Sequence, residues 1–264
     1  MKNTGLIQLV TGLIIGIGLL NTSLQAETGP LGFGDSEFKQ ELETDRPDFT
    51  EGTQTIDPGH FQLESGYTYY DDSRDAHTLP EFLLRSGMME DLELRVSWLG
   101  YVFENHANGT SDMSLGFKHR IYQEDGMPTV SYIFELGLPV GSDNQSAEEV
   151  EPALKVLWSY DASDLIGFSG NLNIASRNGD IERFTESSAS FSTAVSLTDT
   201  LGMYTEYFGI YPAGGARGEL DEHYINAGLT LATSVNSQLD VRTGFGLNSD
   251  AADMFSGIGF TFRI

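Results

Sequence analysis

The chain has 264 residues, 39 of them acidic and 14 basic, and its formal net charge is −25 at pH 7. It contains no cysteine, which excludes disulfide bonds, thiolate metal sites, cysteine nucleophiles and a lipid-anchored cysteine. The acidic excess argues against binding of nucleic acid, because phosphate backbones are contacted by lysine and arginine. With 39% hydrophobic and 11% aromatic residues, the chain is too apolar for intrinsic disorder.

Residues 1–26 have the layout of a secretory signal peptide. Lys2 supplies a positive charge, residues 5–20 form an uncharged and mostly apolar run, and residues 21–26 are polar or small. We expect cleavage after Ala26 or within a few residues of it. An uncleaved membrane anchor is the alternative, but this run is shorter than the ~20 residues that a spanning helix needs.

Residues 27–58 have no clear periodicity and are rich in Gly, Pro, Asp, Glu and Thr, which predicts an extended arm. From residue 59 onward, apolar and polar residues alternate, as in Leu92–Trp98, so that the two sets lie on opposite faces of a strand. The predicted strands are 59–70, 78–87, 92–103, 112–123, 128–140, 152–161, 165–176, 185–197, 201–211, 223–234, 238–247 and 254–264. Most of them have about the ~9–11 residues with which a tilted strand crosses a bilayer.

The connections between the predicted strands alternate in length. Those at 88–91, 124–127, 162–164, 198–200 and 235–237 are short, and the intervening ones are longer and acidic or rich in glycine. Short turns on one rim, long loops on the other and an even strand number are typical of outer-membrane barrels whose termini lie on the periplasmic side. We therefore expect an all-β, antiparallel up-and-down transmembrane β-barrel of about twelve strands at 59–264. Its expected location is the outer membrane of a Gram-negative bacterium, with the signal peptide removed.

The two faces of the predicted strands differ in charge. The outward set, to which Val96, Val102 and Leu136 belong, contains no Asp, Glu, Lys or Arg, and His119 is its ionisable exception. A soluble sandwich would show the same alternation with its apolar face inward, but the signal peptide, strand length and connection pattern favour the barrel. The inward set supplies the candidate lumen-lining residues, which are Glu64, Glu81, Arg85, Glu93, Arg95, Lys118, Arg120, Glu135, Lys155, Glu206, Asp240 and Arg242.

Two interpretations of these inward charges remain open. Either they pair with one another and fill a narrow barrel, or several of them line a pore and tune its selectivity.

The arm also allows two interpretations. Residues 43–52 can fold into the lumen as a plug, since an extended segment of about 10 residues spans roughly 30 Å, or they can form a periplasmic linker that caps the turns. In the plug, Arg46 would meet carboxylates such as Glu64 or Glu93, and the acids of the arm would meet Arg85 or Arg95. The candidate plug residues are Asp45, Arg46, Pro47, Asp48 and Phe49.

Three stretches of the sequence resemble a known family. They are Glu43–Gly52 with Asp57–Tyr67, Leu138–Ser142, and Asn248–Ile264. The family is that of the outer-membrane transporters of the phenol-degradation meta-pathway, and the resemblance spans residues 43–264. It implies an outer-membrane β-barrel that passes small molecules, without fixing the solute. The alternate apolar residues that end the chain also resemble an outer-membrane assembly signal, which implies the barrel assembly machinery as a partner of the last strand.

Catalytic and metal sites are less well supported. His106–Asp112 superficially resembles the active-site stretch of outer-membrane phospholipase A, in which the nucleophilic serine lies two residues after the histidine. Asn108 occupies that position here, and Ser111 has the opposite parity, so a histidine-activated hydroxyl is not expected. Acidic loop residues offer oxygen ligands for Ca²⁺ but lack a defined ligand spacing; they are Asp143, Glu148, Glu149, Glu151, Glu219, Asp221 and Glu222.

Taken together, the sequence predicts a non-enzymatic channel or transporter for the passive passage of small solutes, with aromatic or hydrophobic compounds as a candidate class. No metal, cofactor or nucleic-acid partner is expected. The expected partners are a small-molecule solute, outer-membrane lipid and the assembly machinery. The alternatives are a barrel enzyme that acts on lipid and a structural or adhesive barrel.

Overall fold

The computed structural model describes residues 38, 41–71, 75–104, 107–179, 182–213 and 220–264. The predicted signal peptide and the first part of the predicted arm lie outside the described residues. The strands are β1 (Phe61–Asp71), β2 (Ala76–Met89), β3 (Leu92–Trp98), β4 (Tyr101–Glu104), β5 (Gly109–Thr110), β6 (Met113–Tyr122), β7 (Thr129–Leu138), β8 (Glu151–Ser163), β9 (Ile166–Arg177), β10 (Phe184–Ser196), β11 (Leu201–Ala213), β12 (Glu222–Ser234), β13 (Ser237–Gly246) and β14 (Met254–Arg263). Within these ranges, no helix is long and apolar enough to cross a membrane.

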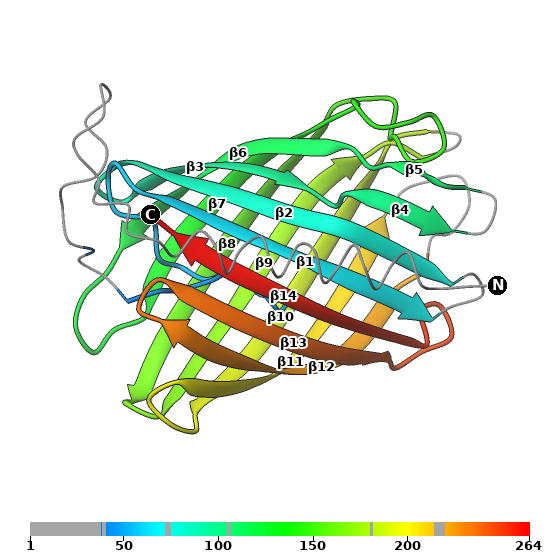
Figure 1. Cartoon of the computed structure of the whole chain (residues 1–264). Coiled ribbons are helices and arrows are strands. Elements are labelled where there is room, and N and C mark those ends of the chain that lie inside the picture. Colours follow the sequence, from blue (N-terminus) through cyan, green and yellow to red (C-terminus); the bar gives the residue numbers. More distant parts are fainter. Residues whose placement is uncertain (1–37, 39–40, 72–74, 105–106, 180–181, 214–219) are drawn as a thin grey trace. The chain divides into compact units, whose positions relative to one another are not determined.

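The strands form one closed antiparallel sheet (Figure 1). β1 pairs with both β2 and β14, which closes the barrel. β3 and β4 both pair with β2 and together form one interrupted strand of the barrel. β6 pairs with β3 and β5 pairs with β4, so β5 and β6 form a second interrupted strand. The barrel therefore has twelve strands, and the predicted up-and-down architecture is confirmed. Pairing of β1 with β14 removes the two open edges that a flat sheet would expose to lipid.

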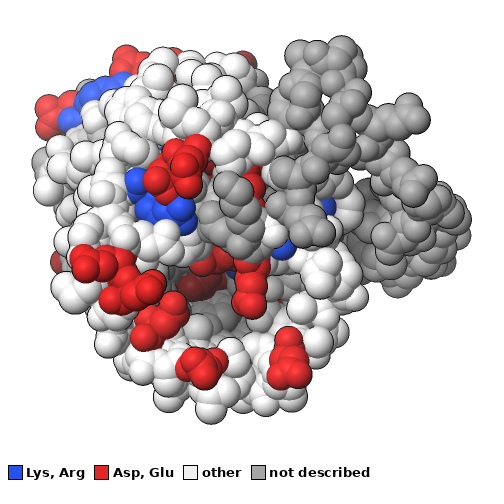
Figure 2. All heavy atoms as spheres, turned by 90° about the vertical axis from the view of Figure 1, so that its left-hand side faces the viewer, with Lys and Arg blue, Asp and Glu red and all other residues white. Residues whose placement is uncertain are grey.

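The two rims of the barrel differ in their connections. The turn rim carries the short connections 90–91, 123–128, 164–165, 197–200 and 235–236, and the described residues of the longer connections, such as 139–150 and 247–253, lie at the loop rim. Ile264 lies at the turn rim, where Phe61 donates a backbone hydrogen bond of 2.8 Å to it. Figure 2 views the turn rim and shows acidic side chains spread around it. The exposed acids in its turns and at the strand ends are Glu90, Glu124, Asp125, Asp161, Asp164 and Asp199.

One predicted strand, 92–103, is interrupted at Gly100. This residue has a φ of 85°, a conformation that glycine adopts without steric cost. The interruption shifts the alternation by one residue, so that Val102 pairs with buried Thr78 and lines the interior, whereas Tyr101 is exposed on the outside. The prediction that Val102 faces outward was therefore wrong.

The outer face is apolar, as lipid contact requires. Leu115, Leu172 and Val241 are 49%, 63% and 45% exposed on it. The outer face also carries three histidines, each paired with a tyrosine: Tyr67–His77 at 2.8 Å, Tyr207–His223 at 2.7 Å and His119–Tyr132 at 3.4 Å, all measured from the hydroxyl oxygen to Nδ1. The sequence prediction named only His119. His77 and His223 lie near the loop-rim ends of their strands, where the membrane interface lowers the cost of a charge.

Candidate functional site: the interior cavity and the arm

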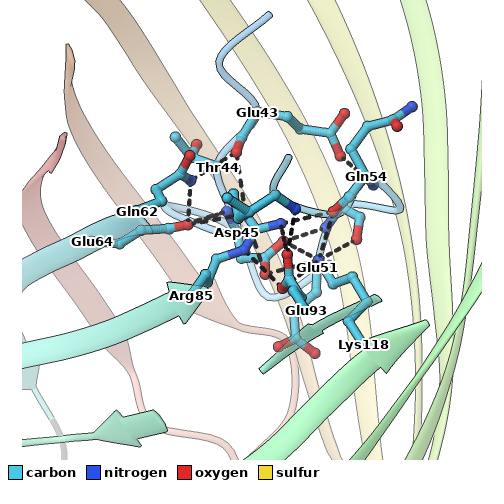
Figure 3. A network of polar contacts seen from close by, with 12 residues as sticks. Glu43, Thr44, Asp45, Glu51, Gln54, Gln62, Glu64, Arg85, Glu93 and Lys118 are labelled. Carbon is cyan, nitrogen blue, oxygen red and sulfur yellow. Dashed lines mark hydrogen bonds and ion pairs between the residues drawn. The ribbon is translucent and has the colours of Figure 1, made fainter. Parts of the chain in front are cut away.

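Residues 43–57, called the arm from here on, lie inside the barrel. They contact inward side chains of β1, β2, β3 and β6 (Figure 3). Further contacts join them to β7, β8, β11 and β13. The arm forms no helix or strand, so its buried amide and carbonyl groups need other hydrogen-bond partners. Side chains of the barrel wall supply them.

Inward carboxylates accept hydrogen bonds from the amides of the arm. The bonds run from Asp45 and Arg46 to Glu64 (3.0 and 2.9 Å), from Ile56 to Glu93 (2.9 Å), and from Phe49 and Thr50 to Glu206 (2.8 and 2.6 Å). Hydrogen bonds to an ionised acceptor are roughly twice as strong as neutral ones. The carboxylates of the wall thus accept the amide hydrogen bonds that the carbonyl groups of a neighbouring strand would accept in a sheet.

Inward cations of the barrel wall donate hydrogen bonds to backbone carbonyls of the arm. Arg85 Nη2 donates to the carbonyl of Gln54 at 2.7 Å, and Lys118 Nζ donates to that of Gly52 at 2.7 Å. Arg85 is at the same time bidentate on Glu93, with Nε at 2.9 Å and Nη2 at 3.0 Å from its two oxygens. The fork of Arg85 is therefore shared between the wall and the arm.

Asp45 lies at the centre of this network. Its carboxylate accepts hydrogen bonds from Arg95 Nη1 at 2.5 Å and Lys118 Nζ at 3.0 Å, and Arg85 Nη1 is 3.7 Å away. Burial alone would raise the pKa of Asp45, but the charges of Arg85, Lys118 and Arg95 outweigh burial and hold the pKa well below its ordinary value. Asp45 is therefore a carboxylate around which three cations of the wall are arranged.

Arg46 and Glu51 extend the network on either side. Arg46 Nη1 binds Glu81 at 2.7 Å, and its Nε is 3.6 Å from Asp240, so its guanidinium contacts these two acids instead of the expected Glu64 or Glu93. Glu51 binds Arg95 at 2.7 Å and Lys155 at 2.8 Å.

Eleven of the twelve inward residues named from the sequence contact the arm directly. The twelfth, Glu135, contacts Lys155 at 3.0 Å and reaches the arm through it. The eleven are Glu64, Glu81, Arg85, Glu93, Arg95, Lys118, Arg120, Lys155, Glu206, Asp240 and Arg242.

A cavity of about 890 Å³ lies between the arm and the loop rim. Arm residues Asp45–Phe49 and Glu51 form its floor. One wall is charged: Lys155 lies between Glu51 and Glu135, and Arg177 binds Glu151 at 3.0 Å. On the turn-rim side of the arm, a void of about 10 Å³ lies among Gln54, Asp57 and Arg85.

The opposite wall of the cavity is aromatic. Phe49 of the arm stacks on Phe208 of β11 with ring centroids 4.4 Å apart and planes 4° apart, and Tyr224 of β12 stacks on Phe208 at 4.7 Å. Phe255 of β14 completes the cluster, 5.9 Å from Tyr224. The sequence prediction missed the three strand residues. Phe208 lies two residues after the inward Glu206, so the alternation of the predicted strand 201–211 already indicated that Phe208 faces inward.

The other candidate sites do not form comparable groups. His106 lies outside the described residues, and the hydroxyl of Ser111 is 3.4 Å from the carbonyl of Asp112. Glu149 and Glu151 of the acidic loop pair with arginines, at 2.7 and 3.0 Å. Among the residues that the structure describes, which omit Glu219, no three His, Asp or Glu side chains are placed to hold a metal ion.

The fold is shared with solved outer-membrane proteins. The COG4313 outer membrane channel from Pseudomonas putida F1 aligns with a TM-score of 0.61 and 11% identity over 80% of this chain and 98% of that one. The NanC porin gives a TM-score of 0.57 and 12% identity over 77% and 100% of the two chains. The KdgM porin, solved with disordered oligogalacturonate, gives 0.55 and 9% over 76% and 98%. At these identities, the likeness concerns the fold alone.

Sequence comparison assigns the family. A search of curated proteins finds no match. The model of the family described as "Putative MetA-pathway of phenol degradation" matches residues 44–264, which include the arm from Thr44 and every strand of the barrel. The chain therefore belongs to this family of phenol-degradation MetA-pathway proteins.

Proposed function

We propose that the protein is an outer-membrane channel for the passive passage of small solutes, and that the arm is its plug. The observation that carries this proposal is the 890 Å³ cavity, which has the arm as its floor. In this proposal the loop rim faces the exterior and the turn rim faces the periplasm, as in other outer-membrane barrels. A solute enters the cavity from the loop rim and passes on when the arm moves.

The docked arm is the resting state of this channel. Withdrawing Asp45 would take one carboxylate away from Arg95 and Lys118, which are 2% and 0% exposed, and would leave them Glu93 of the wall at 2.9 and 3.9 Å. Breaking a buried ion pair by removing one partner costs about 3–5 kcal/mol. The resting conductance is therefore low, and opening requires the arm to move.

The aromatic wall supports a finer proposal about the solute. Phe49, Phe208, Tyr224 and Phe255 offer aromatic edges and faces to the cavity, and apolar or aromatic compounds gain free energy from such contacts. Small aromatic or hydrophobic compounds are the proposed solute class.

A reversible tether tests the plug. Thr53 Oγ1 of the arm lies 2.6 Å from Ser159 Oγ of β8, so a Thr53→Cys/Ser159→Cys pair has its sulfur atoms within reach of a disulfide. The chain has no other cysteine. In planar bilayers, we expect the oxidised double variant to stay at low conductance and its reduced form to show more frequent or larger openings. The two single variants are the controls and should not respond to reductant.

Two results would contradict the proposal in different ways. Equal currents before and after reduction, with the disulfide verified by mass spectrometry, would rule out the arm as the plug. The channel itself would be ruled out if no form of the protein gave current or liposome swelling, including a folded variant that lacks residues 43–52.

A further inference from the structure

The charges that line the cavity are unequal in number. Ten acidic side chains and four basic ones line it. Several of the acids are neutralised locally: Glu51 and Glu135 flank Lys155, and Glu151 and Glu186 flank Arg177. The remaining acidic excess makes the potential in the cavity negative, and low-dielectric walls focus such a field.

Asp48 is one of three acids of the cavity without a lysine or arginine partner among the described residues. It lies on the floor of the cavity next to Phe49, and it forms no ion pair with any lysine or arginine in the part of the chain that the structure describes. Two further acids of the cavity without a basic partner have other donors: Asp112 accepts the amides of Gly141 and Ala147 at 2.8 Å each, and Glu222 accepts the Tyr224 hydroxyl at 2.6 Å. Asp48 has the Ser192 hydroxyl as a hydrogen-bond partner, but burial and the neighbouring carboxylate of Glu206 outweigh this contact and raise the pKa of Asp48 well above its ordinary value.

Arg242, which contacts the residue before Asp48, is engaged with other partners. Arg242 donates to the carbonyl of Pro47 at 2.7 Å and to Thr68 Oγ1 at 2.9 Å, and its guanidinium lies 5.4 Å from the centre of the Phe255 ring. These contacts hold Arg242 against the wall. Asp48 lines the cavity beside Phe49, and its carboxyl group also neighbours Ser192 and Glu206 of the wall.

We propose that the cavity selects small organic cations that carry an apolar ring, with the cationic group paired to Asp48 and the ring packed against Phe49 and Ile210. This inference rests on the proposed function and adds a charge preference to it. A cation supplies the counter-charge that Asp48 lacks, and the aromatic wall favours cations near its rings. A ring compound without charge gains only the apolar contacts, and an anion is repelled by the acidic lining.

Calorimetric titration of the refolded protein in detergent micelles tests the charge preference with isosteric probes. We expect 2-phenylethylammonium to bind at least about tenfold more tightly than 2-phenylethanol, and phenylacetate to bind least. Methylammonium, which has the charge without the ring, should also bind about tenfold more weakly than 2-phenylethylammonium.

The residue assignment is tested with Asp48→Asn, which should reduce the affinity for 2-phenylethylammonium to that for 2-phenylethanol. Asp199→Asn removes the same charge from an exposed turn and should leave the affinity unchanged. A cation preference that survives Asp48→Asn, or equal affinities for the three ring probes, would overturn the inference. Because binding is measured without an open pore, a protein that binds the cation but conducts nothing would contradict the proposed function and leave the binding preference standing.

Discussion

Gly66 of β1 and Gly259 of β14 are directly opposite each other across the strand pair that closes the barrel, and the guanidinium of Arg46 lies over both. A Cβ atom built on Gly66 would lie 2.4 Å from Arg46 Nη2, and one built on Gly259 would lie 2.4 Å from Arg46 Nε. Both distances are far below van der Waals contact. Because these two glycines lack side chains, they leave a space, called the seat below, in which the Arg46 guanidinium lies between Glu81 and Asp240.

We expect Gly259→Ala to displace Arg46 and to destabilise the protein by about 1–3 kcal/mol, the usual cost of overpacking. Urea unfolding of the refolded barrel measures the free energy, and limited proteolysis measures the exposure of the arm. Gly167→Ala is the matched control, because its new Cβ would meet nothing closer than 3.4 Å. Equal stability and equal protection of the arm in both variants would show that the seat does not hold it.

Replacing Asp45 tests the centre of the network. Asp45→Asn removes the charge of the carboxylate that Arg95 and Lys118 share, and we expect a loss of about 3–5 kcal/mol in the free energy of unfolding. Asp199→Asn, at an exposed turn, should change it by less than about 0.5 kcal/mol. If the two variants had equal stability, the buried ion pairs of Asp45 would not stabilise the docked arm.

The depressed pKa of Asp45 predicts how docking of the arm responds to pH. A carboxyl group whose native pKa is lowered stabilises the native state at pH values above its unfolded pKa of about 3.9, and this stabilisation is lost as the pH falls through the native value. Asp45 faces the cations Arg85, Arg95 and Lys118 and the acids Glu64 and Glu93. We expect hydrogen exchange of the arm amides, corrected for intrinsic rates, to be constant from pH 7 to about 5 and protection to fall only below about pH 4. Release of the arm near pH 6 would contradict this assignment.

The alternation of residue types was sufficient to predict the barrel, because the side-chain period of a strand is fixed by its backbone geometry. It failed at Gly100, where a single residue of positive φ shifts the register. Parity also selected the inward charged residues, of which eleven contact the arm. Parity cannot determine partners, since Arg46 binds Glu81 and Asp240 across strands that are far apart in sequence. The aromatic wall was missed because Phe208, Tyr224 and Phe255 occupy positions expected to be polar, and their clustering depends on the closure of the sheet.

The assignment of faces can be tested with adjacent residues of one strand. Val96 of β3 pairs with Leu84 and Leu115, which are exposed on the outer face, whereas Ser97 lines the cavity. Arginine on the lipid face costs about 2–4 kcal/mol near the bilayer midplane, so Val96→Arg should reduce the free energy of folding into lipid vesicles by that amount. Ser97→Arg places the same side chain beside an acid-rich cavity and should be tolerated with a change below about 1 kcal/mol. Folded and unfolded fractions are measured by the shift in electrophoretic mobility between unheated and heated samples. Equal losses for the two variants would show that the register of β3 is wrong.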